Sequence, residues 1–332
     1  MMPTRRIGAL VALVAALLVA LTACVQTGDD GVDGERVYND PAASPGFTLG
    51  DNPRVVGLGW SDGAVALELG VKPVAVYDWM AFGEATKGVG EWDAPKFGDV
   101  TPTLLSAQSQ GEFNYQQIEE LEPDLILNVR AKNDPAVTER LSKIAPVVTA
   151  PDGAGDFAVN WKTQTELIGK ALGKGDEAAK LIADTEATSN RLKNENPEFT
   201  GKTFVSAVKF GNAYGAYLEG DARFDVFAAL GFVQNPPVTR LQSSGFFASV
   251  PVERVSDLNA QVALFSTIGL PFAELQNDAR LNSLAVVRDG RAVEIPEDGP
   301  ANQGLAAGTP VSLKFSLEQI TPKLAAAARP AP

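Results

Sequence analysis

The chain has no histidine and only one cysteine among its 332 residues. Without imidazole it has no histidine metal ligand, and Ser-His-Asp or Cys-His catalysis is excluded. A single cysteine cannot form an intramolecular disulfide, so the hydrophobic core must hold the fold. These absences disfavour the direct capture of zinc or manganese and remove the commonest routes to nucleophilic catalysis.

Positive charge is scarce as well, with 28 Lys and Arg against 41 Asp and Glu, a formal net charge of −13. Residues 1–24 carry two arginines and no acid, so the rest of the chain has a charge of −15, two below −13. Such a surface does not suit the nucleic-acid backbone. After the first 24 residues, no apolar run approaches the length of a membrane span.

The N-terminus has the three parts of a secretory signal. Arg5 and Arg6 are followed by an apolar run over residues 7–21 and then by Leu21-Thr22-Ala23-Cys24. A positive start, an apolar stretch and small residues before a cut are typical of an export signal. The last four residues also match a lipobox, which predicts lipidation of Cys24 and a place on the extracytoplasmic face of the cell membrane. The alternative, an uncleaved membrane helix, would be short for a span of ~20 residues.

Composition divides the remaining chain. Residues 25–50 are rich in Gly, Asp and Pro, which predicts a flexible tether. About 280 residues follow, enough for two lobes on the usual size of a domain. We predict an N-terminal lobe at 51–160, linking helices at 161–197 and a C-terminal lobe at 198–332.

Strand and helix patterns alternate in the first lobe. Apolar runs predict strands at 55–58, 74–77, 125–127 and 146–149, and helical patterns predict helices at 62–69, before 121 and at 134–143. Ser61 with Asp62 is expected to cap the first helix, and Gly70 to end it. This alternation of apolar strands and helices predicts a parallel sheet covered on both faces.

The middle of the chain contains no strand signal. Helical spacing runs from Trp161 to Asn196, with Asp176 as the expected N-cap of a helix of ~20 residues, about 30 Å long. The second half then repeats the first, with strands expected at 203–208, 262–265, 285–287 and 291–294 and helices at 224–230, 252–258 and 315–328. Asp289-Gly290 predicts a hairpin turn between the last two strands.

Five segments resemble one protein family. Residues 114–126, NYQQIEELEPDLI, resemble the N-x-E-x-I-x-x-L-x-P-D-L-I stretch of the class III substrate-binding proteins, the receptors of ABC importers for iron-siderophores, haem and cobalamin. Further matches follow in the family's order, at residues 69–74, 168–173, 252–255 and 285–291. The resemblance covers about residues 54–325 and is nearest to the iron-siderophore branch in its lipoprotein form.

The family resemblance implies an α/β fold of two Rossmann-like lobes with parallel sheets, joined by a single long interlobe helix, with the ligand cleft between the lobes. It implies a binding protein rather than an enzyme, without a permanent cofactor or a metal held by the protein. The ferric siderophore would be the transported ligand, and the partners would be an ABC importer permease and its ATPase. The receptor would be a monomer.

Docking to the permease would use one acidic residue on each lobe. Glu253 matches the C-lobe glutamate of the family, whereas Gln116 stands where the N-lobe glutamate is expected. Glutamine can form hydrogen bonds but no salt bridge, so Glu112, Glu119 or Glu120 would have to substitute. For each of these acids the alternative is a solvated surface position.

Ligand groups in parallel α/β sheets come from the carboxyl ends of strands. Aromatic walls and arginine donors suit the flat surface and exposed oxygens of a catecholate or hydroxamate complex. Four of the candidates also have a structural interpretation. Trp161 could belong to the core between the lobes, and Arg223 could pair with Glu219 or Asp221. Phe246 and Phe247 could pack at a corner of the core. The predicted ligand-binding residues are Trp60, Ser61, Tyr77, Trp79, Arg130, Trp161, Tyr214, Tyr217, Arg223, Arg240, Phe246, Phe247 and Thr267.

Two other functions compete with siderophore binding. The same fold could bind haem or cobalamin, and haem would then need Tyr77, Tyr214 or Tyr217 as its ligand. A secreted hydrolase using paired carboxylates is the remote alternative, although the sequence contains no recognisable catalytic motif. The acidic charge disfavours strongly anionic triscatecholates, so hydroxamate or mixed siderophores are favoured.

Overall fold

The computed structural model describes residues 37–38, 49–107 and 112–329. The predicted signal, with Cys24, and most of the predicted tether lie outside the described residues. Within the tether, the short strand β1 (Val37–Tyr38) pairs in parallel with β6, so this part of 25–50 has regular structure. None of the helices formed by the described residues is long and apolar enough to cross a membrane.

The N-terminal lobe is built on a six-stranded sheet with the strand order β1-β6-β5-β2-β3-β4. Every adjacent pair is parallel, as the alternation in the sequence predicted. The strands after β1 are β2 (Val55–Gly57), β3 (Ala75–Tyr77), β4 (Thr103–Leu105), β5 (Leu125–Asn128) and β6 (Val147–Thr149). The edge strand β4 was not predicted, because residues 103–105 form a short run without alternating polarity.

The expected helices of this lobe are confirmed as α1 (Asp62–Glu68), α2 (Tyr115–Glu120) and α3 (Pro135–Ser142), with 3-10 turns η2 (Glu84–Thr86) and η3 (Ala94–Phe97). Asn114 and Asp134 cap α2 and α3 through their side chains. Ser61 stands at the N-cap position of α1, where it was predicted, but its side chain does not cap the helix. Its φ of +63° is left-handed and its hydroxyl caps no helical N–H. That hydroxyl faces Trp79 instead.

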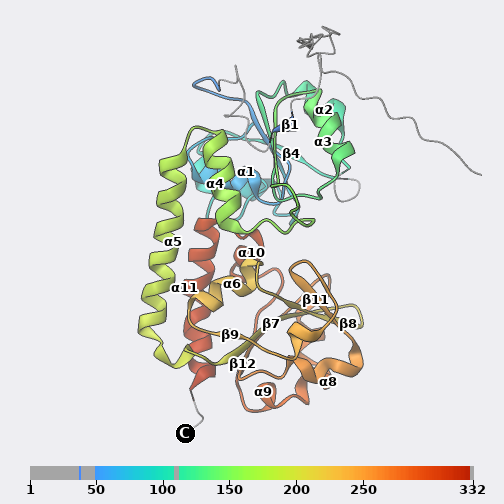
Figure 1. Cartoon of the computed structure of the whole chain (residues 1–332), viewed down its shortest axis with the longest axis vertical. Helices are drawn as coiled ribbons and strands as arrows, with labels where there is room; N and C mark the ends of the chain where they lie inside the picture. Colours follow the sequence, from blue (N-terminus) through green and yellow to red (C-terminus); the bar gives the residue numbers. More distant parts are fainter. Residues whose placement is uncertain (1–36, 39–48, 108–111, 330–332) are drawn as a thin grey trace, which may run out of the picture. The chain divides into compact units, whose positions relative to one another are not determined.

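Two helices link the lobes, α4 (Trp161–Ala171) and α5 (Gly175–Glu195). Asn160 caps α4 by accepting from the N–H groups of Lys162 and Thr163. Helix α5 begins before its predicted cap, so Asp176 lies in the first turn, where its charge complements the helix dipole. Figure 1 shows α5 beside α11 (Pro310–Ala328), which starts five residues earlier than predicted.

The C-terminal sheet has the order β10-β11-β8-β7-β12-β13, with β9 beside β7. Its strands are β7 (Thr203–Phe210), β8 (Ala213–Tyr217), β9 (Val233–Gln234), β10 (Ser243–Ser244), β11 (Phe247–Val250), β12 (Val262–Thr267) and β13 (Ala292–Glu294). The two-lobe α/β prediction is confirmed, but this second sheet is mixed rather than parallel throughout. The two residues between β7 and β8 can only join antiparallel strands.

The hairpin predicted over residues 285–294 is wrong. Residues Ala285–Arg288 form the helical turn α9, and β13 pairs in parallel with β12. Val286 is fully buried, and its N–H donates to Asn259 Oδ1 at 2.9 Å. This tertiary bond overrides the strand preference of two adjacent valines. Gly290, at φ +68°, follows the end of the turn and leads the chain into β13.

Helices on both faces complete the C-terminal lobe. They are α6 (Ala222–Ala229), α7 (Phe272–Gln276), α8 (Ala279–Asn282) and α10 (Pro300–Ala307), with 3-10 segments η4 (Pro197–Phe199), η5 (Val238–Arg240) and η6 (Val252–Leu258). The helices expected at 224–230 and 315–328 are therefore present with shifted ends, and the helix expected at 252–258 is the 3-10 segment η6.

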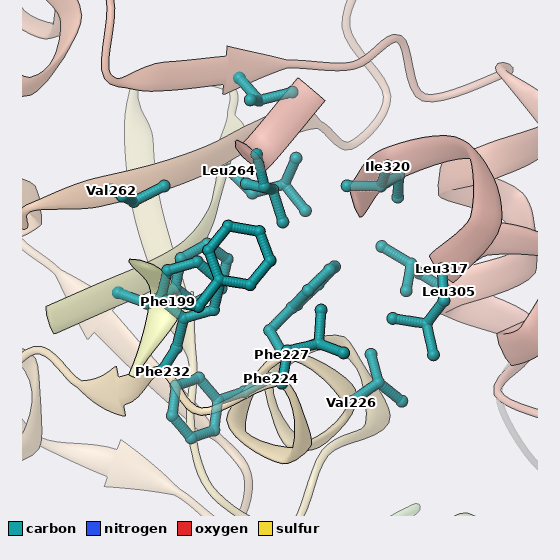
Figure 2. Packing of buried hydrophobic residues seen from close by; sticks show 14 of the residues in the cluster. Phe199, Phe224, Val226, Phe227, Phe232, Val262, Leu264, Leu305, Leu317 and Ile320 are labelled. Atoms are coloured by element: carbon teal, nitrogen blue, oxygen red, sulfur yellow. The ribbon is translucent and has the colours of Figure 1, made fainter. Parts of the chain in front are cut away.

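Aromatic rings fill the core between this sheet and helices α6, α10 and α11. Figure 2 shows Phe199 and Phe232 near Val262 and Leu264, across from Leu317 and Ile320 of α11. The rings of Phe199 and Phe232 stack with centroids 4.5 Å apart. Burying each large apolar side chain contributes about 1.5–3 kcal/mol. This packing fixes α11 and α6 against the strands that lead to the site.

Candidate ligand-binding site

Three aromatic rings stack beyond the carboxyl ends of the N-terminal strands. Trp60 follows β2, and Trp79 follows β3. The Trp60 ring lies between that of Trp79, at 4.4 Å and 7°, and that of Phe157, at 4.1 Å and 23°. Trp79 Nε1 donates to Ser61 Oγ at 3.3 Å, which fixes one end of the stack. Trp60, Ser61 and Trp79, which were predicted because they follow the ends of strands, thus lie together in the structure.

Small pockets lie on either side of this aromatic stack. One is lined by Trp60, Tyr77, Phe113 and Phe157, and the other by Tyr77, Trp79 and a set of residues that includes Phe82 and Trp92. The rings of Tyr77 and Phe113 meet edge to face at 5.2 Å. The surfaces offered to a ligand are therefore flat and mostly apolar.

The buried carboxylate of Asp62 fixes the backbone next to the aromatic stack. Asp62 accepts from the N–H groups of Val129 at 2.7 Å and Arg130 at 3.3 Å, and from Gln164 Nε2 at 2.7 Å. Gln164 Nε2 also donates to the Trp60 carbonyl at 2.9 Å. Burial raises the pKa of Asp62 to about 6, against the lowering effect of these donors.

Glycine is required beside this carboxylate. A Cβ at position 59 would lie 2.1 Å from Asp62 Oδ2 and 2.9 Å from the backbone nitrogen of Arg130. Gly59 therefore lets the chain between β2 and Trp60 pass close to the carboxylate, so that Asp62 can reach the loop after β5.

The Arg130 side chain crosses from the N-terminal lobe to the C-terminal lobe. Its Nη1 donates to the carbonyls of Ala306 at 3.3 Å and Ala307 at 3.0 Å, in the last turn of α10. Gly308 ends that helix at φ +67°, where a Cβ would lie 2.9 Å from Arg130 Nη1. Burial lowers the pKa of Arg130 to about 10, and Asp221 opposes that shift. The guanidinium thus has a structural role, and its contact with ligand stays a prediction.

A second arginine is held among aromatic rings in the C-terminal lobe. Arg223 donates from Nε and Nη2 to the two oxygens of Asp221, each at 2.7 Å. Its guanidinium carbon lies 3.8 Å from the ring centroid of Tyr217 and 5.7 Å from that of Phe246. Burial alone would lower the pKa of Arg223, but Asp221 and Tyr217 raise it. The alternative interpretation of Arg223 as a partner of Asp221 is confirmed. The ring of Phe247 also lies close to this group, 5.5 Å from the ring of Tyr217.

Groups from both lobes share one pocket. Its lining includes Arg130 and Phe157 from the N-terminal lobe, Trp161 at the start of α4, and Gly220 with Asp221 from the C-terminal lobe. Trp161 is 8% exposed and also belongs to the C-terminal hydrophobic core, so the core alternative holds for most of its surface. It also lines a separate cavity of about 900 Å³ between α5 and α6.

Three predicted residues, Tyr214, Thr267 and Arg240, make none of the contacts described above. Tyr214 and Tyr217 are three residues apart in β8, so they lie on opposite faces of the sheet. The Tyr214 hydroxyl donates to Asp278 at 2.7 Å, and burial raises its pKa to about 12. Thr267 is buried and donates to the Leu270 carbonyl at 3.0 Å, whereas Arg240 is exposed at the end of η5.

Sequence reasoning missed several groups of the site. Phe157 lies in an irregular segment with φ +55°, and Phe113 precedes a helix, so neither follows a predicted strand. Asp221 was named only as a possible partner of Arg223, and its role as the N-cap of α6 was not predicted, although an acid before a helix is a typical N-cap. Asp62 was read only as part of a cap. Among the described residues, no group of three or more acids or cysteines could hold a metal ion.

Two α/β lobes that meet at aromatic and arginine-lined pockets define the chain as a solute-binding protein. The chain belongs to the periplasmic binding protein family, whose sequence profile matches residues 68–298. The probable siderophore-binding lipoprotein YfiY of Bacillus subtilis is 30% identical over 269 residues, which cover 74% of this chain and 76% of the relative.

Solved structures share this fold. A periplasmic solute-binding protein from Mycobacterium smegmatis is similar with a TM-score of 0.73 and 26% identity, over 84% of this chain and 94% of that one. PiaA of Streptococcus pneumoniae, solved in complex with ferrichrome, has a TM-score of 0.70 at 24% identity, over 85% of this chain and 95% of that one. At this low identity, the similarity to PiaA supports the fold alone.

Proposed function

We propose that this chain is an extracytoplasmic lipoprotein that captures a ferric siderophore and delivers it to an ABC importer, without catalysing a reaction. The observation that carries the proposal is that aromatic rings and arginine side chains from both lobes gather around Arg130. Trp60, Trp79 and Phe157 offer flat rings on one side, and Arg223 lies between aromatic rings on the other. The name of the B. subtilis relative supports the same ligand class.

The chemistry of this site suits a preformed iron complex. A ferric siderophore already satisfies its iron, so the receptor needs apolar walls and a few donors rather than metal ligands. Haem capture through Tyr214 is disfavoured, because its hydroxyl is engaged with Asp278 on the other face of the sheet. We propose attachment through Cys24, with residues of the tether keeping the receptor near its importer and raising its local concentration there.

A ferric hydroxamate should bind the purified protein and quench its tryptophan fluorescence, with submicromolar affinity. Trp60→Ala should weaken that affinity by about 10- to 100-fold, because it removes the central ring of the stack. Isothermal titration calorimetry measures both proteins without relying on the altered fluorescence.

Tyr115→Ala is the matched control for this affinity measurement, since Tyr115, the first residue of α2, packs against Arg140 of α3 and does not line the pockets described above. Its affinity should equal that of the wild type. Tight binding of haem or cobalamin, with no binding of ferric hydroxamate or ferric catecholate, would refute the proposed ligand class.

Docking to the permease is proposed for Glu253 and Gln116, both of which are exposed. Gln116 Nε2 donates to Glu120 Oε1 at 2.9 Å, so an acid lies beside the glutamine at the proposed contact. Glu253→Lys should reduce uptake of radiolabelled ferric siderophore at least about fivefold in cells with the cognate importer, because the lysine would repel the permease arginines that the family resemblance implies as partners of Glu253. Glu274→Lys, another exposed glutamate, is the control. Equal uptake by both variants would argue against docking through Glu253.

A further inference from the structure

The central ring of the aromatic stack is covered on both faces. The ring of Trp60 has Trp79 on one face, at 4.4 Å, and Phe157 on the other, at 4.1 Å. Rings at these separations are in direct contact, so no part of a ligand can enter between them. A ligand that stacks on Trp60 must therefore first displace one of its two neighbours.

The pockets beside the stack are also too small for the proposed ligand. The pocket lined by Trp60, Tyr77 and Phe113 and the pocket shared by the two lobes each enclose about 10 Å³, the space of one water molecule. Sites for drug-sized ligands enclose about 300–1,000 Å³. Among the residues that line these two pockets, Phe157 is the one they have in common. Moving its ring would join the pockets along the face of Trp60.

Of the two rings beside Trp60, that of Phe157 is held less firmly. Trp79 Nε1 donates to Ser61 Oγ at 3.3 Å, and its ring lies within 7° of parallel to that of Trp60. The phenyl ring of Phe157 has no polar group and is tilted by 23°. Its backbone has a φ of +55°, which is strained for a bulky side chain. Displacing Phe157 therefore breaks no side-chain hydrogen bond and can release strain.

Phe157 belongs to an irregular segment, residues 150–160, between β6 and α4. Gly153 has a φ of +80°, and a Cβ there would meet no atom within 4 Å, so this part of the segment is not packed against the lobe. The Phe157 N–H donates to the Ala131 carbonyl at 2.9 Å, and Asn133 donates two further bonds to the segment, at 3.0 and 3.1 Å. The bonds from Asn133 are exposed, so water can replace them when the segment moves.

A buried acceptor lies in the pocket behind Phe157. Asn128, the last residue of β5, lines this pocket and is 5% exposed. Its Oδ1 is buried, and no group of the described residues donates to it. A buried acceptor without a donor is unfavourable, so a group that brings a donor to this place gains binding energy. An amide N–H or a hydroxyl of a siderophore would supply that donor once Phe157 has moved.

We propose, on the basis of the function proposed above, that Phe157 is the gate of the ligand site. The ferric siderophore displaces its ring and takes its place on Trp60. The two small pockets then become one site, which contains the face of Trp60, the acceptor of Asn128 and the guanidinium of Arg130, 5.7 Å from the Trp60 ring. Phe157 thus controls the entry of the ligand and competes with it, rather than forming a wall of the occupied site.

Stopped-flow fluorescence with a ferric trihydroxamate as the probe measures this gate. Phe157→Gly removes the ring, and glycine accepts the positive φ without strain. With the open form of the wild type populated at about 10% or less, the association rate constant should rise about tenfold or more in Phe157→Gly, and the dissociation constant should fall by a similar factor.

Two further variants serve as controls for the stopped-flow measurement. Phe157→Tyr keeps a ring on Trp60 and should bind the ferric trihydroxamate at the wild-type rate. Phe272→Ala removes a half-buried ring from α7, away from the pockets beside the stack, and should also bind at the wild-type rate.

A second measurement follows the gate without a ligand. Fluorine NMR of protein labelled with fluorotryptophan observes the four tryptophans, and Trp60→Phe assigns the signal of Trp60. In the wild type this signal should show exchange between the covered and open positions on the μs–ms timescale of segment motions. In Phe157→Gly the exchange should be absent, and the signal should lie at the open position.

The outcomes separate the gate from the proposed function. The gate is overturned if Phe157→Gly binds the ferric trihydroxamate no faster than the wild type, or if it binds more weakly, as expected for a wall of the site. If neither protein binds any ferric hydroxamate or catecholate, the proposed function fails instead. The fluorine signals then decide on the gate alone. Exchange in the wild type that Phe157→Gly lacks supports it, and equal signals without exchange in both proteins overturn it.

Discussion

Replacing Asp62 by alanine is expected to lower the free energy of unfolding by about 3–5 kcal/mol. The carboxylate accepts from the N–H groups of Val129 and Arg130, which would be left without this partner in a buried site, and from Gln164 Nε2, which would keep only its bond to the Trp60 carbonyl. Each unsatisfied donor costs about 1–3 kcal/mol, and water that enters the space would recover only part of it. Urea unfolding of the unliganded protein measures the change.

Asp134→Ala is the matched control for Asp62→Ala. Asp134 also accepts from a backbone N–H, that of Ala136 at 3.0 Å, but it does so on the surface. Water can replace it there, so the loss should be clearly smaller. Comparable losses for the two variants would show that the burial of Asp62 adds nothing to its hydrogen bonds.

The pH dependence of Asp62 has a defined sign. Burial raises its pKa from 3.8 to about 6, so the folded state retains a proton that the unfolded state loses. Stability should therefore fall as the pH rises from about 4 to about 6, by roughly 2–3 kcal/mol, and then level off. In Asp62→Asn this fall should disappear, and urea unfolding at several pH values measures the difference between the two proteins.

The parts of the fold that the sequence predicted well are those set by local patterns. Apolar runs located β2, β3 and β5, and the stretch without a strand signal after Trp161 located α4 and α5. The hairpin at 285–294 failed because Asn259, distant in the sequence, holds the Val286 N–H in a helical turn. A single sequence does not reveal such a partner, and it did not reveal the antiparallel part of the second sheet either.

The predicted site divides in the same way. The strand-end rule found Trp60, Ser61 and Trp79, because their places follow from where strands end. It misplaced Tyr214, because no strand was predicted directly after 203–208, whereas residues 213–217 form β8 and put the side chains of Tyr214 and Tyr217 on opposite faces of the sheet. Phe157 escaped because its contact with Trp60 depends on how the chain after β6 folds back.

Arg130→Met is expected to destabilise the unliganded protein by about 2–4 kcal/mol. The carbonyls of Ala306 and Ala307 would lose their buried donor, and Asp221 would lose one of the two cations that act on it. Methionine fills most of the space of the arginine stem, so the loss reports mainly on the polar groups. Urea unfolding without ligand is again the measurement.

Arg54→Met separates this structural role of Arg130 from a ligand contact. Arg54 also donates to main-chain carbonyls, those of Leu121 and Glu122, but at an exposed site, so its loss should cost less than about 1 kcal/mol. If Arg130 acts as the structure shows, only Arg130→Met weakens the unliganded protein, and ligand affinity falls as a consequence of the loosened lobes. If both variants are equally stable and only Arg130→Met loses affinity for the ferric siderophore, the guanidinium must leave α10 to bind the ligand, as the sequence first indicated.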